Sequence, residues 1–141
     1  MIKLAVIGKM KNQELSSLCN DYEKRITRFD NIEISVLKDS TLQKESEKLL
    51  EIIEKFKGST FVMSQEGKTF TSEEFSKLLE NNPNSLFIIG GAYGLSQEVK
   101  NKATKIVSFS PMTFTHEFAR AFLLEQLYRA KTITAKTGYH H

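Results

Sequence analysis

The sequence predicts an α/β domain in which helices cover both faces of a mostly parallel sheet. Short runs rich in apolar, β-branched and aromatic residues alternate along the chain with longer segments whose apolar residues recur at helical spacing. The short runs are continuously apolar rather than alternating, which is typical of strands buried on both faces. The length of 141 residues suits a single domain that spans residues 1–141.

Five of the short runs are expected to be strands. They are Ile2–Ile7, Ile32–Leu37, Thr60–Met63, Leu86–Ile89 and Ile106–Phe109. Glycines follow two of them, and we expect Gly8 and Gly67 to mark turns because glycine adopts backbone conformations that other residues avoid.

Helical segments follow each of the five strands. They span about 12–28, 41–57, 71–81, 96–103 and 116–131. We expect Ser72 to cap the third helix, with two acidic residues in its first turn, and the segment 81–84, which contains a proline, to end it. Ser96 and Thr115 are the expected caps of the fourth and fifth helices.

The last helix is apolar around much of its circumference over residues 117–131. An amphipathic surface helix would carry a narrower apolar stripe. If one side packs on the sheet, a second copy of the chain is the simplest cover for the rest, so we predict a homodimer formed through this helix. The alternative is a central helix wrapped by its own chain.

Composition and charge exclude several classes of protein. The 20 basic and 17 acidic residues give a net charge of +3, far from the dense basic patches of general nucleic-acid binders. Cys19 is the single cysteine, so no internal disulfide can form, and the start of the chain does not resemble a signal peptide. No apolar stretch approaches the roughly 20 residues that span a bilayer. We expect a cytoplasmic protein with no membrane segment.

Three glycines follow the fourth predicted strand and precede the cap Ser96. Gly90, Gly91 and Gly94 do not form G-x-G-x-x-G, and no Lys-Ser or Lys-Thr follows, which disfavours dinucleotide and P-loop triphosphate binding. Parallel sheets bind ligands at the carboxyl ends of their strands. The loop therefore predicts a small-molecule crevice, although a structural turn would use the same residues.

A second loop, 108–117, follows the fifth predicted strand. Pro111 prevents the strand from continuing, and Met112 and Phe114 offer an apolar surface against which a heterocycle could pack. The same hydrophobic side chains could instead plug the core.

Polar candidates lie on the last helix and at the end of the chain. Arg129 follows Glu125 by four positions, the spacing of an exposed ion pair. Arg120 and Arg129 are nine positions apart and so on opposite helix faces, where they could serve different walls of a site at a dimer interface. His116 opens the helix, where capping or packing is the simpler role. His140 and His141 end the chain and could be a tag remnant. No spacing of His, Cys, Asp and Glu indicates a metal site.

Several motifs combine in order to resemble one family. They are Gly90-Gly91-x-x-Gly94-Leu95, the segment 108–116, Glu125–Ala130, and Tyr139-His140. Together they resemble the RlmH family, bacterial methyltransferases of the SPOUT or α/β-knot superfamily, along the whole chain and including Tyr22–Arg25. This chain resembles a short member, trimmed between the second strand and the second helix. The resemblance implies a C-terminal trefoil knot, a homodimer, and S-adenosylmethionine-dependent methylation of N3 of a pseudouridine in 23S ribosomal RNA within the assembled 70S ribosome.

The resemblance also implies site residues. Those expected to hold S-adenosylmethionine are Met63, Gly90, Phe109, Ser110, Pro111, Met112, Thr113 and Phe114. His140 is the candidate base, Arg129 or Arg120 could stabilise a developing oxyanion or hold a phosphate, and Tyr139 could stack on the uracil ring or hydrogen-bond to it. Thr115 stands where the family usually has proline.

Three other functions remain open from the residues. A SPOUT methyltransferase acting on another RNA base or on a ribose 2′-OH would use the same pocket. A non-catalytic RNA- or ribosome-binding module would lack affinity for S-adenosylmethionine. A CheY-like or flavodoxin-like module would need an acidic cluster at the strand ends, whereas the first strand ends in Ile7-Gly8-Lys9.

Overall fold

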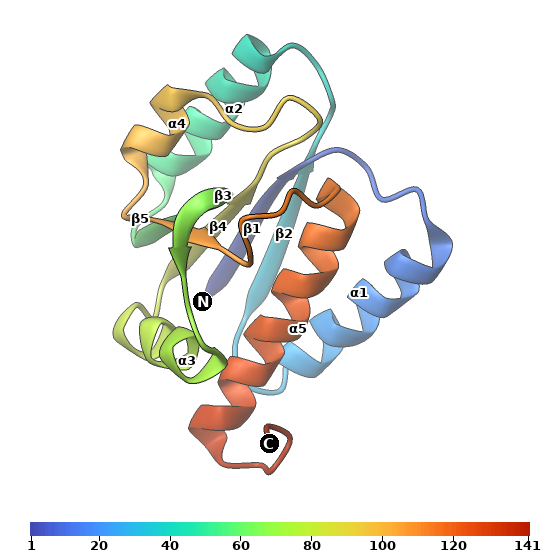
Figure 1. Cartoon of the computed structure of the whole chain (residues 1–141), viewed down its shortest axis with the longest axis vertical. Helices are drawn as coiled ribbons and strands as arrows, with labels where there is room; N and C mark the ends of the chain where they lie inside the picture. The colour runs from blue at the N-terminus through green and yellow to red at the C-terminus, as the bar shows by residue number, and fades with distance from the viewer.

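A computed structural model describes residues 1–141 and contains a five-stranded sheet between two layers of helices (Figure 1). The strand order is β2-β1-β4-β3-β5, and every neighbouring pair is parallel. The strands are β1 (Ile2–Ile7), β2 (Ile32–Leu37), β3 (Ser59–Thr69), β4 (Ser85–Ile89) and β5 (Lys105–Ser108). The predicted α/β class, a parallel sheet with helices on both faces, is confirmed.

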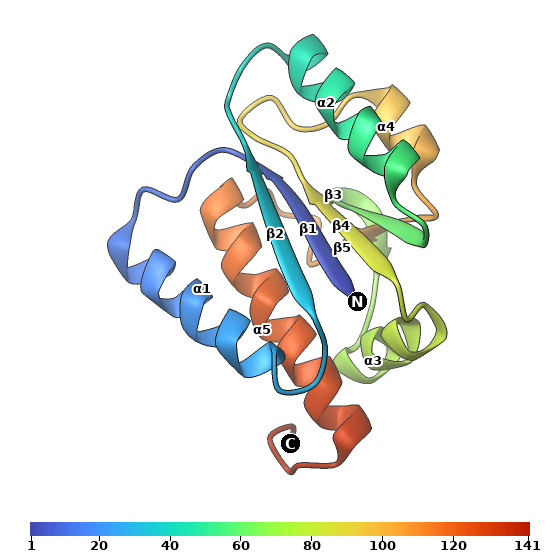
Figure 2. The ribbon, with the colours of Figure 1, turned by 180° about the vertical axis from the view of Figure 1, so that it is seen from behind.

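Helices α1, α3 and α5 cover one face of the sheet, and α2 and α4 cover the other (Figures 1 and 2). Their bounds are α1 (Gln13–Ile26), α2 (Leu42–Lys55), α3 (Ser72–Asn81), α4 (Gln97–Lys102) and α5 (His116–Ala135). Four of the five agree with the expected segments to within two residues at each end. Helix α5 continues four residues beyond the expected end.

The core has one hydrophobic cluster on each face of the sheet, because successive strand residues point to opposite sides. In β1, Leu4 and Val6 join the cluster under α1, α3 and α5, while Ala5 and Ile7 join the cluster under α2 and α4. All four side chains are buried. Full burial of a leucine-sized side chain contributes about 1.5–3 kcal/mol to stability. Because the strands supply buried side chains to both clusters, apolar contact with the strands is the main attachment of both helical layers.

The helix caps agree with the sequence at α4 and α5 and differ at α3. The side chains of Ser96 and Thr115 accept hydrogen bonds from backbone N–H groups in the first turns of α4 and α5, as expected. The cap of α3 is Thr71 and not Ser72: Thr71 and Glu74 form a reciprocal capping box. The prediction was wrong by one residue because Glu74 can reach back only to the residue three positions before it.

Strand β3 extends past its apolar run through an irregularity in its pairing with β5. The register shifts between Met63 and Lys68, so the residues between them bulge out of the ladder. The expectation that Gly67 marks a turn was wrong, because this residue lies inside β3. A β-carbon there would lie 2.6 Å from the carbonyl oxygen of Ile106, so the close approach of the two strands requires glycine.

Helix α5 is buried against the sheet along one side and exposed along another. Leu123, Leu124 and Leu127 are fully buried, whereas the side chains of Phe118 and Phe122 are 47% and 41% exposed. The helix packs between α1 and α3, and the C-terminus lies at the opposite end of it from the β4–α4 loop in both views (Figures 1 and 2). Neither α5 nor any other helix is long and apolar enough to cross a membrane.

Candidate functional site

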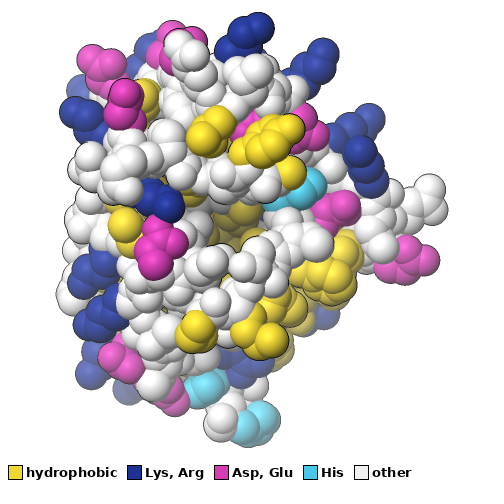
Figure 3. Space-filling view, turned by 45° about the horizontal axis from the view of Figure 1, so that its top comes forward, with side chains coloured by type: hydrophobic (Ala, Val, Ile, Leu, Met, Phe, Trp, Pro, Cys, Tyr) yellow, Lys and Arg dark blue, Asp and Glu magenta, His cyan; other side chains and the backbone are white.

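A cavity of about 650 Å³ opens at the carboxyl ends of the central strands. Three segments form most of its lining: the end of the apolar run of β3 with its bulge, the β4–α4 loop, and the β5–α5 loop; Lys100 of α4 and His116 and Ala119 of α5 complete it. Figure 3 shows a hollow on this side of the molecule with hydrophobic side chains around it and a basic side chain beside an acidic one at its rim. The cavity lies where ligands bind in parallel α/β sheets.

The β4–α4 loop folds back on itself at its glycines. The backbone N–H of Gly94 donates to the carbonyl oxygen of Gly91 at 3.0 Å, and Gly94 has a φ of +72°. A β-carbon at Gly90 would lie 2.6 Å from the carbonyl oxygen of Gly94. No side chain fits at position 90 without moving the backbone, so the loop presents bare main chain to the cavity at this position.

The β5–α5 loop is held to the β3 bulge by side-chain hydrogen bonds. The hydroxyl of Ser108 lies 3.2 Å from the carbonyl oxygen of Gln65, and the hydroxyl of Thr113 donates to the side-chain oxygen of Gln65 at 2.8 Å. Within the loop, the Ser110 hydroxyl accepts from the backbone N–H of Met112. These bonds fix the two walls of the cavity relative to each other.

Aromatic rings connect the cavity to the exposed side of α5. Phe109 and Phe114 line the cavity, and both contact Phe122, with ring centroids 6.2 Å and 5.3 Å apart. Phe118 stacks on Phe122 at 5.9 Å. Met112 is 72% exposed, so it does not plug the core. The apolar side chains of this loop form a surface that continues out of the cavity.

One ion pair stands in the cavity wall. Oε1 of Glu66, in the β3 bulge, lies 2.6 Å from Nζ of Lys100 on α4, and the hydroxyl of Ser64 donates to the other oxygen of Glu66. Hydrogen bonds from Lys100 and Ser64 lower the pKa of Glu66 to about 2. Sequence reasoning missed this pair because its members are 34 positions apart and belong to elements that only the fold brings together.

The start of α5 is fastened to the β1–α1 connection. Oε1 of Glu117 accepts from the backbone N–H groups of Lys11 and Asn12, both at 2.9 Å, and these bonds lower the pKa of the carboxyl group. His116 lines the cavity, and its Cε1 would lie 2.9 Å from a β-carbon on Gly8. The expected packing role of His116 agrees with this contact.

Most of the residues predicted to hold a cofactor gather in the cavity. Those that line it are Met63, Gly90, Phe109, Ser110, Met112, Thr113 and Phe114. Pro111 is exposed and is not among the lining residues.

The residues predicted to be catalytic lie elsewhere, and three of them meet near the C-terminal end of α5. The hydroxyl of Tyr139 donates to Oε1 of Glu125 at 3.2 Å, and the guanidinium of Arg129 lies over the Tyr139 ring, 4.8 Å from its centroid. Arg129 also pairs with Glu125 at 2.6 Å, as its spacing predicted. Burial, followed by the hydrogen bond to Tyr22, raises the pKa of Tyr139 well above its usual value. Tyr139 is therefore a hydrogen-bond donor and not a base.

Both ring nitrogens of His140 have partners. Nδ1 lies 3.0 Å from Nη1 of Arg129, and Nε2 lies 2.7 Å from Oε1 of Glu73 on α3. A guanidinium can only donate, so Nδ1 accepts and Nε2 carries the proton that is donated to Glu73. In this arrangement the ring is neutral and has no free lone pair. It must leave these partners before it can accept a proton from a substrate.

Arg120 is separate from both groups. Its Nε is buried without a hydrogen-bond partner, and its charge acts on Cys19 of α1, where burial raises the pKa of the thiol and Arg120 opposes that rise. It does not line the cavity. The structure thus brings Arg129, Tyr139 and His140 together and leaves Arg120 apart.

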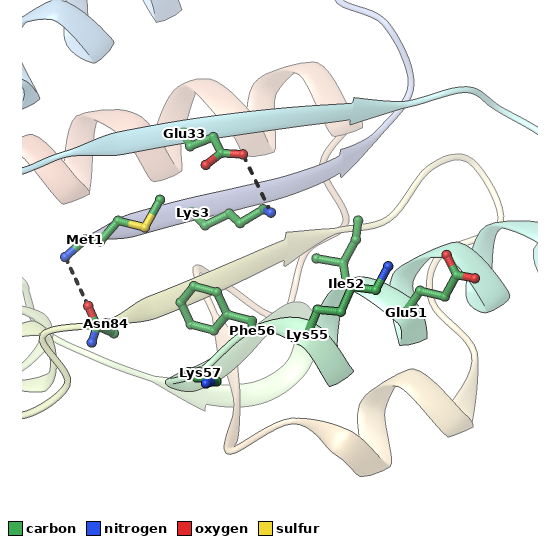
Figure 4. Close-up of a pocket in the computed structure, with 9 residues that line it drawn as sticks. All are labelled: Met1, Lys3, Glu33, Glu51, Ile52, Lys55, Phe56, Lys57 and Asn84. Carbon is green, nitrogen blue, oxygen red and sulfur yellow. Dashed lines mark hydrogen bonds and ion pairs between the residues drawn. The ribbon is translucent and has the colours of Figure 1, made fainter.

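A second cavity, of about 430 Å³, lies near the amino-terminal ends of β1 and β4 (Figure 4). Lysines and glutamates line it together, and Nζ of Lys3 on β1 lies 3.7 Å from Oε1 of Glu33 on the neighbouring strand β2. No predicted site residue and no glycine loop borders it. The structure contains no group of three or more His, Cys, Asp or Glu side chains that could hold a metal ion.

The chain matches a family model described as "Predicted SPOUT methyltransferase" over residues 1–140. It is 40% identical to the ribosomal RNA large subunit methyltransferase H of Dictyoglomus thermophilum over 151 positions, covering 99% of each chain. The proteins of the same name from Flavobacterium johnsoniae and Streptococcus pneumoniae CGSP14 are 38% and 41% identical, and each comparison covers 99% of this chain and 98% of the relative.

Solved structures resemble the fold at much lower identity. A methyltransferase of Legionella pneumophila, solved with bound SAM, superposes with a TM-score of 0.56 at 14% identity, over 92% of this chain and 66% of that one. The SpoU methyltransferase AviRb of Streptomyces viridochromogenes, solved with AdoMet, has a TM-score of 0.51 at 9% identity, over 96% of this chain and 58% of that one. These likenesses support the fold and nothing finer.

Proposed function

The chain belongs to the SPOUT methyltransferase family, and on that basis we propose that it transfers the methyl group of S-adenosylmethionine to N3 of a pseudouridine in 23S ribosomal RNA. The observation that carries the proposal is the glycine-lined cavity formed by the two predicted loops. The full-length relatives named ribosomal RNA large subunit methyltransferase H support the choice of RNA.

The cavity fits S-adenosylmethionine in size and in lining. Its volume of about 650 Å³ lies within the roughly 300–1,000 Å³ of small-molecule sites. Met63, Phe109 and Phe114 offer apolar contacts for a nucleoside, and the bare backbone at Gly90 lets main-chain groups approach a base edge. When bound, the cofactor supplies an electrophilic methyl group on a sulfonium sulfur.

Methylation of N3 requires a proton acceptor and a cation from residues outside the cofactor cavity. N3 of the base carries a proton, which must leave before the nitrogen lone pair can form the new N–CH₃ bond. We propose His140 as the proton acceptor, Arg129 as the cation that stabilises charge developing on the neighbouring carbonyl oxygen, and Tyr139 as the ring that holds the base. Arg120, which has no anionic partner, remains a candidate for a phosphate contact.

The distance between cavity and tail calls for two copies of the chain. His116 lines the cavity, and Arg129, which holds His140, is 13 residues further along the same helix. At 1.5 Å per residue the two sites are roughly 20 Å apart along the axis. We propose that the chain dimerises through the exposed aromatic side of α5 and that the tail of one copy completes the cavity of the other.

We propose in addition that the C-terminal part forms a trefoil knot. In support, the chain passes from α4 on one face of the sheet through the edge strand β5 to α5 on the other face, and loops from both sides of that passage line the cavity.

The RNA target is proposed to be the assembled ribosome. A net charge of +3 neutralises few phosphates, and phosphate neutralisation drives binding to naked RNA. A shaped assembly offers more surface to recognise. This substrate would put the enzyme in the bacterial cytoplasm.

Mass mapping of the methylated nucleotide and isothermal titration with S-adenosylmethionine test the proposal. Mass mapping of 23S RNA from ribosomes incubated with the protein and S-adenosylmethionine should give a methyl group on N3 of one pseudouridine. A methyl on a ribose or on another base would assign a different SPOUT activity, and no transfer together with no cofactor binding would favour a non-catalytic module.

Mixed subunits test the shared site. A Gly90→Val chain and a His140→Ala chain, each inactive alone, should recover activity when they are refolded together, because one of the two sites in the mixed dimer is then intact. No recovery would mean that each site is built from a single chain.

A further inference from the structure

Resting on the proposed function, we propose that Glu66 and Lys100 bind the charged amino-acid end of S-adenosylmethionine. Lys100 would bind the α-carboxylate and Glu66 the α-ammonium. Their mutual ion pair would thereby be exchanged for two ion pairs with the ligand.

The charge distribution in the cavity supports this assignment. Glu66 and Lys100 are the only carboxylate and the only ammonium side chains that line it, beside the imidazole of His116 and the phenol of Tyr93. The rest of the lining is apolar, hydroxylic, amide or bare backbone. A nucleoside is neutral and needs no charged partner, whereas an amino acid at neutral pH carries one charge of each sign. The cavity offers one acidic and one basic side chain side by side.

The geometry suits groups that share one carbon atom. An α-ammonium and an α-carboxylate are neighbours in the ligand, so the side chains that bind them must also be neighbours. Oε1 of Glu66 and Nζ of Lys100 are 2.6 Å apart and come from two separate elements, the β3 bulge and α4. The two side chains can therefore separate slightly and admit the ligand between them without leaving their own elements.

The pair is prepared for this role before the ligand arrives. The second oxygen of Glu66 accepts from the hydroxyl of Ser64, which orients the carboxylate, and the low pKa of Glu66 keeps it ionised at any physiological pH. The side chain of Lys100 is 19% exposed and that of Glu66 is 51% exposed, so folding has already removed much of the water around the lysine while the carboxylate stays open to a ligand. Charge-assisted hydrogen bonds in such partly covered sites are stronger than those at open surfaces.

The simpler role for the pair is to tie α4 to the β3 bulge. That role predicts that removing either charge lowers the affinity of the cavity for all its ligands alike, because the wall itself would shift. Recognition of the amino-acid end predicts a loss confined to ligands that possess this end. Two adenosine thioethers separate these outcomes: S-adenosylhomocysteine has the amino acid, and 5′-methylthioadenosine lacks it.

The experiment is isothermal titration of the intact protein with each thioether, using Glu66→Gln and Lys100→Met. We expect each substitution to lower the affinity for S-adenosylhomocysteine about tenfold or more, which is the contribution of one charge-assisted hydrogen bond. The affinity for 5′-methylthioadenosine should stay unchanged. The exposed residues Glu98 and Lys102 of α4, changed to Gln and Met, are matched controls that should bind both ligands normally.

An equal loss for both ligands, or no loss for either, would overturn the assignment. If the unsubstituted protein binds neither thioether nor S-adenosylmethionine, the proposed function itself fails, and that result is distinct from the other two.

Discussion

The guanidinium of Arg129 donates from Nη1 to Nδ1 of His140 across 3.0 Å, which occupies the lone pair that a general base would need. The other ring nitrogen donates to Glu73 at 2.7 Å. An imidazole held by both nitrogens has a fixed orientation, but neither nitrogen is available to accept a further proton. In the proposed mechanism, substrate binding has to draw the ring away from Arg129, which frees Nη1 of the guanidinium for an oxyanion while Nε and Nη2 remain on Glu125.

Replacing His140 by Ala should abolish methyl transfer and leave cofactor affinity unchanged, because the proposed role of the ring is to accept the proton of the RNA base and the ring is not among the residues that line the cofactor cavity. Radiolabelled methyl incorporation into ribosomes and titration with S-adenosylhomocysteine measure the two properties. His141→Ala is the matched control, since His141 is exposed and has no hydrogen bond, and it should be fully active. Near-normal turnover of the His140 variant would reject this residue as the base.

A charge on the exposed side of α5 should separate the proposed dimer. Phe118 is 47% exposed, and its burial in an interface would contribute about 2 kcal/mol, so Phe118→Asp should weaken self-association by at least about tenfold. Sedimentation velocity over a concentration series gives the dissociation constant. Leu18→Asp on α1, which is 43% exposed, should stay dimeric; equal effects of both substitutions would speak against an interface on α5.

A side chain at position 90 should close the cavity. The first carbon of any side chain would lie 2.6 Å from the carbonyl oxygen of Gly94, so Gly90→Val forces the loop to move. We expect a loss of affinity for S-adenosylhomocysteine of about tenfold or more, with the helical circular dichroism of the chain retained. Gly138 has a φ of +85°, so Gly138→Ala also strains the backbone, but at a place that does not line the cavity; this variant should bind S-adenosylhomocysteine normally and controls for strain alone. A Gly90 variant with unaltered affinity would exclude this loop from the site.

The Glu66 ion pair should make stability depend on pH in the acid range. Its pKa falls from an ordinary 4.5 to about 2 on folding, so its stabilising contribution is complete above about pH 4.5 and is lost as the pH falls toward 2. The melting temperature of the unsubstituted protein should exceed that of Glu66→Gln at pH 6, and the difference should shrink between pH 4.5 and 2.5. A constant difference would show that the carboxylate gains nothing from Lys100.

Methyl transfer should be far more efficient with intact ribosomes than with free 23S RNA. The low net charge provides little non-specific attraction to phosphates, so recognition depends on a folded target. Initial rates on the two substrates at matched RNA concentration measure the preference. Equal rates would contradict the proposed ribosomal substrate.

The fold class was predictable because buried parallel strands leave continuous apolar runs. β1 and β2 agree with the sequence to the residue, whereas β3 is several residues longer than its apolar run. The extension follows a bulge, and a bulge depends on which strand lies alongside. Local sequence does not specify that neighbour.

The cavity was partly predictable for the same reason. Glycines after β4 and a proline after β5 mark two loops at one edge of a parallel sheet, and the structure places these loops together. Glu66 and Lys100 lie in segments with no motif, so their 2.6 Å contact follows only from the fold. The separation of His140 from the cavity was equally hidden, because it depends on how the tail folds back along α5.

Gly67 fixes the distance between β3 and β5 independently of the surrounding side chains. Because it lets β3 and β5 approach to a distance at which a β-carbon would touch the carbonyl group of Ile106, the spacing of the two walls is set by main chain rather than by side-chain rotamers. Substitutions of the exposed side chain of Met112 would alter what the cavity contacts but not the spacing of these strands. Substitutions of exposed side chains around the cavity can thus change ligand preference while the backbone spacing of β3 and β5 stays constant.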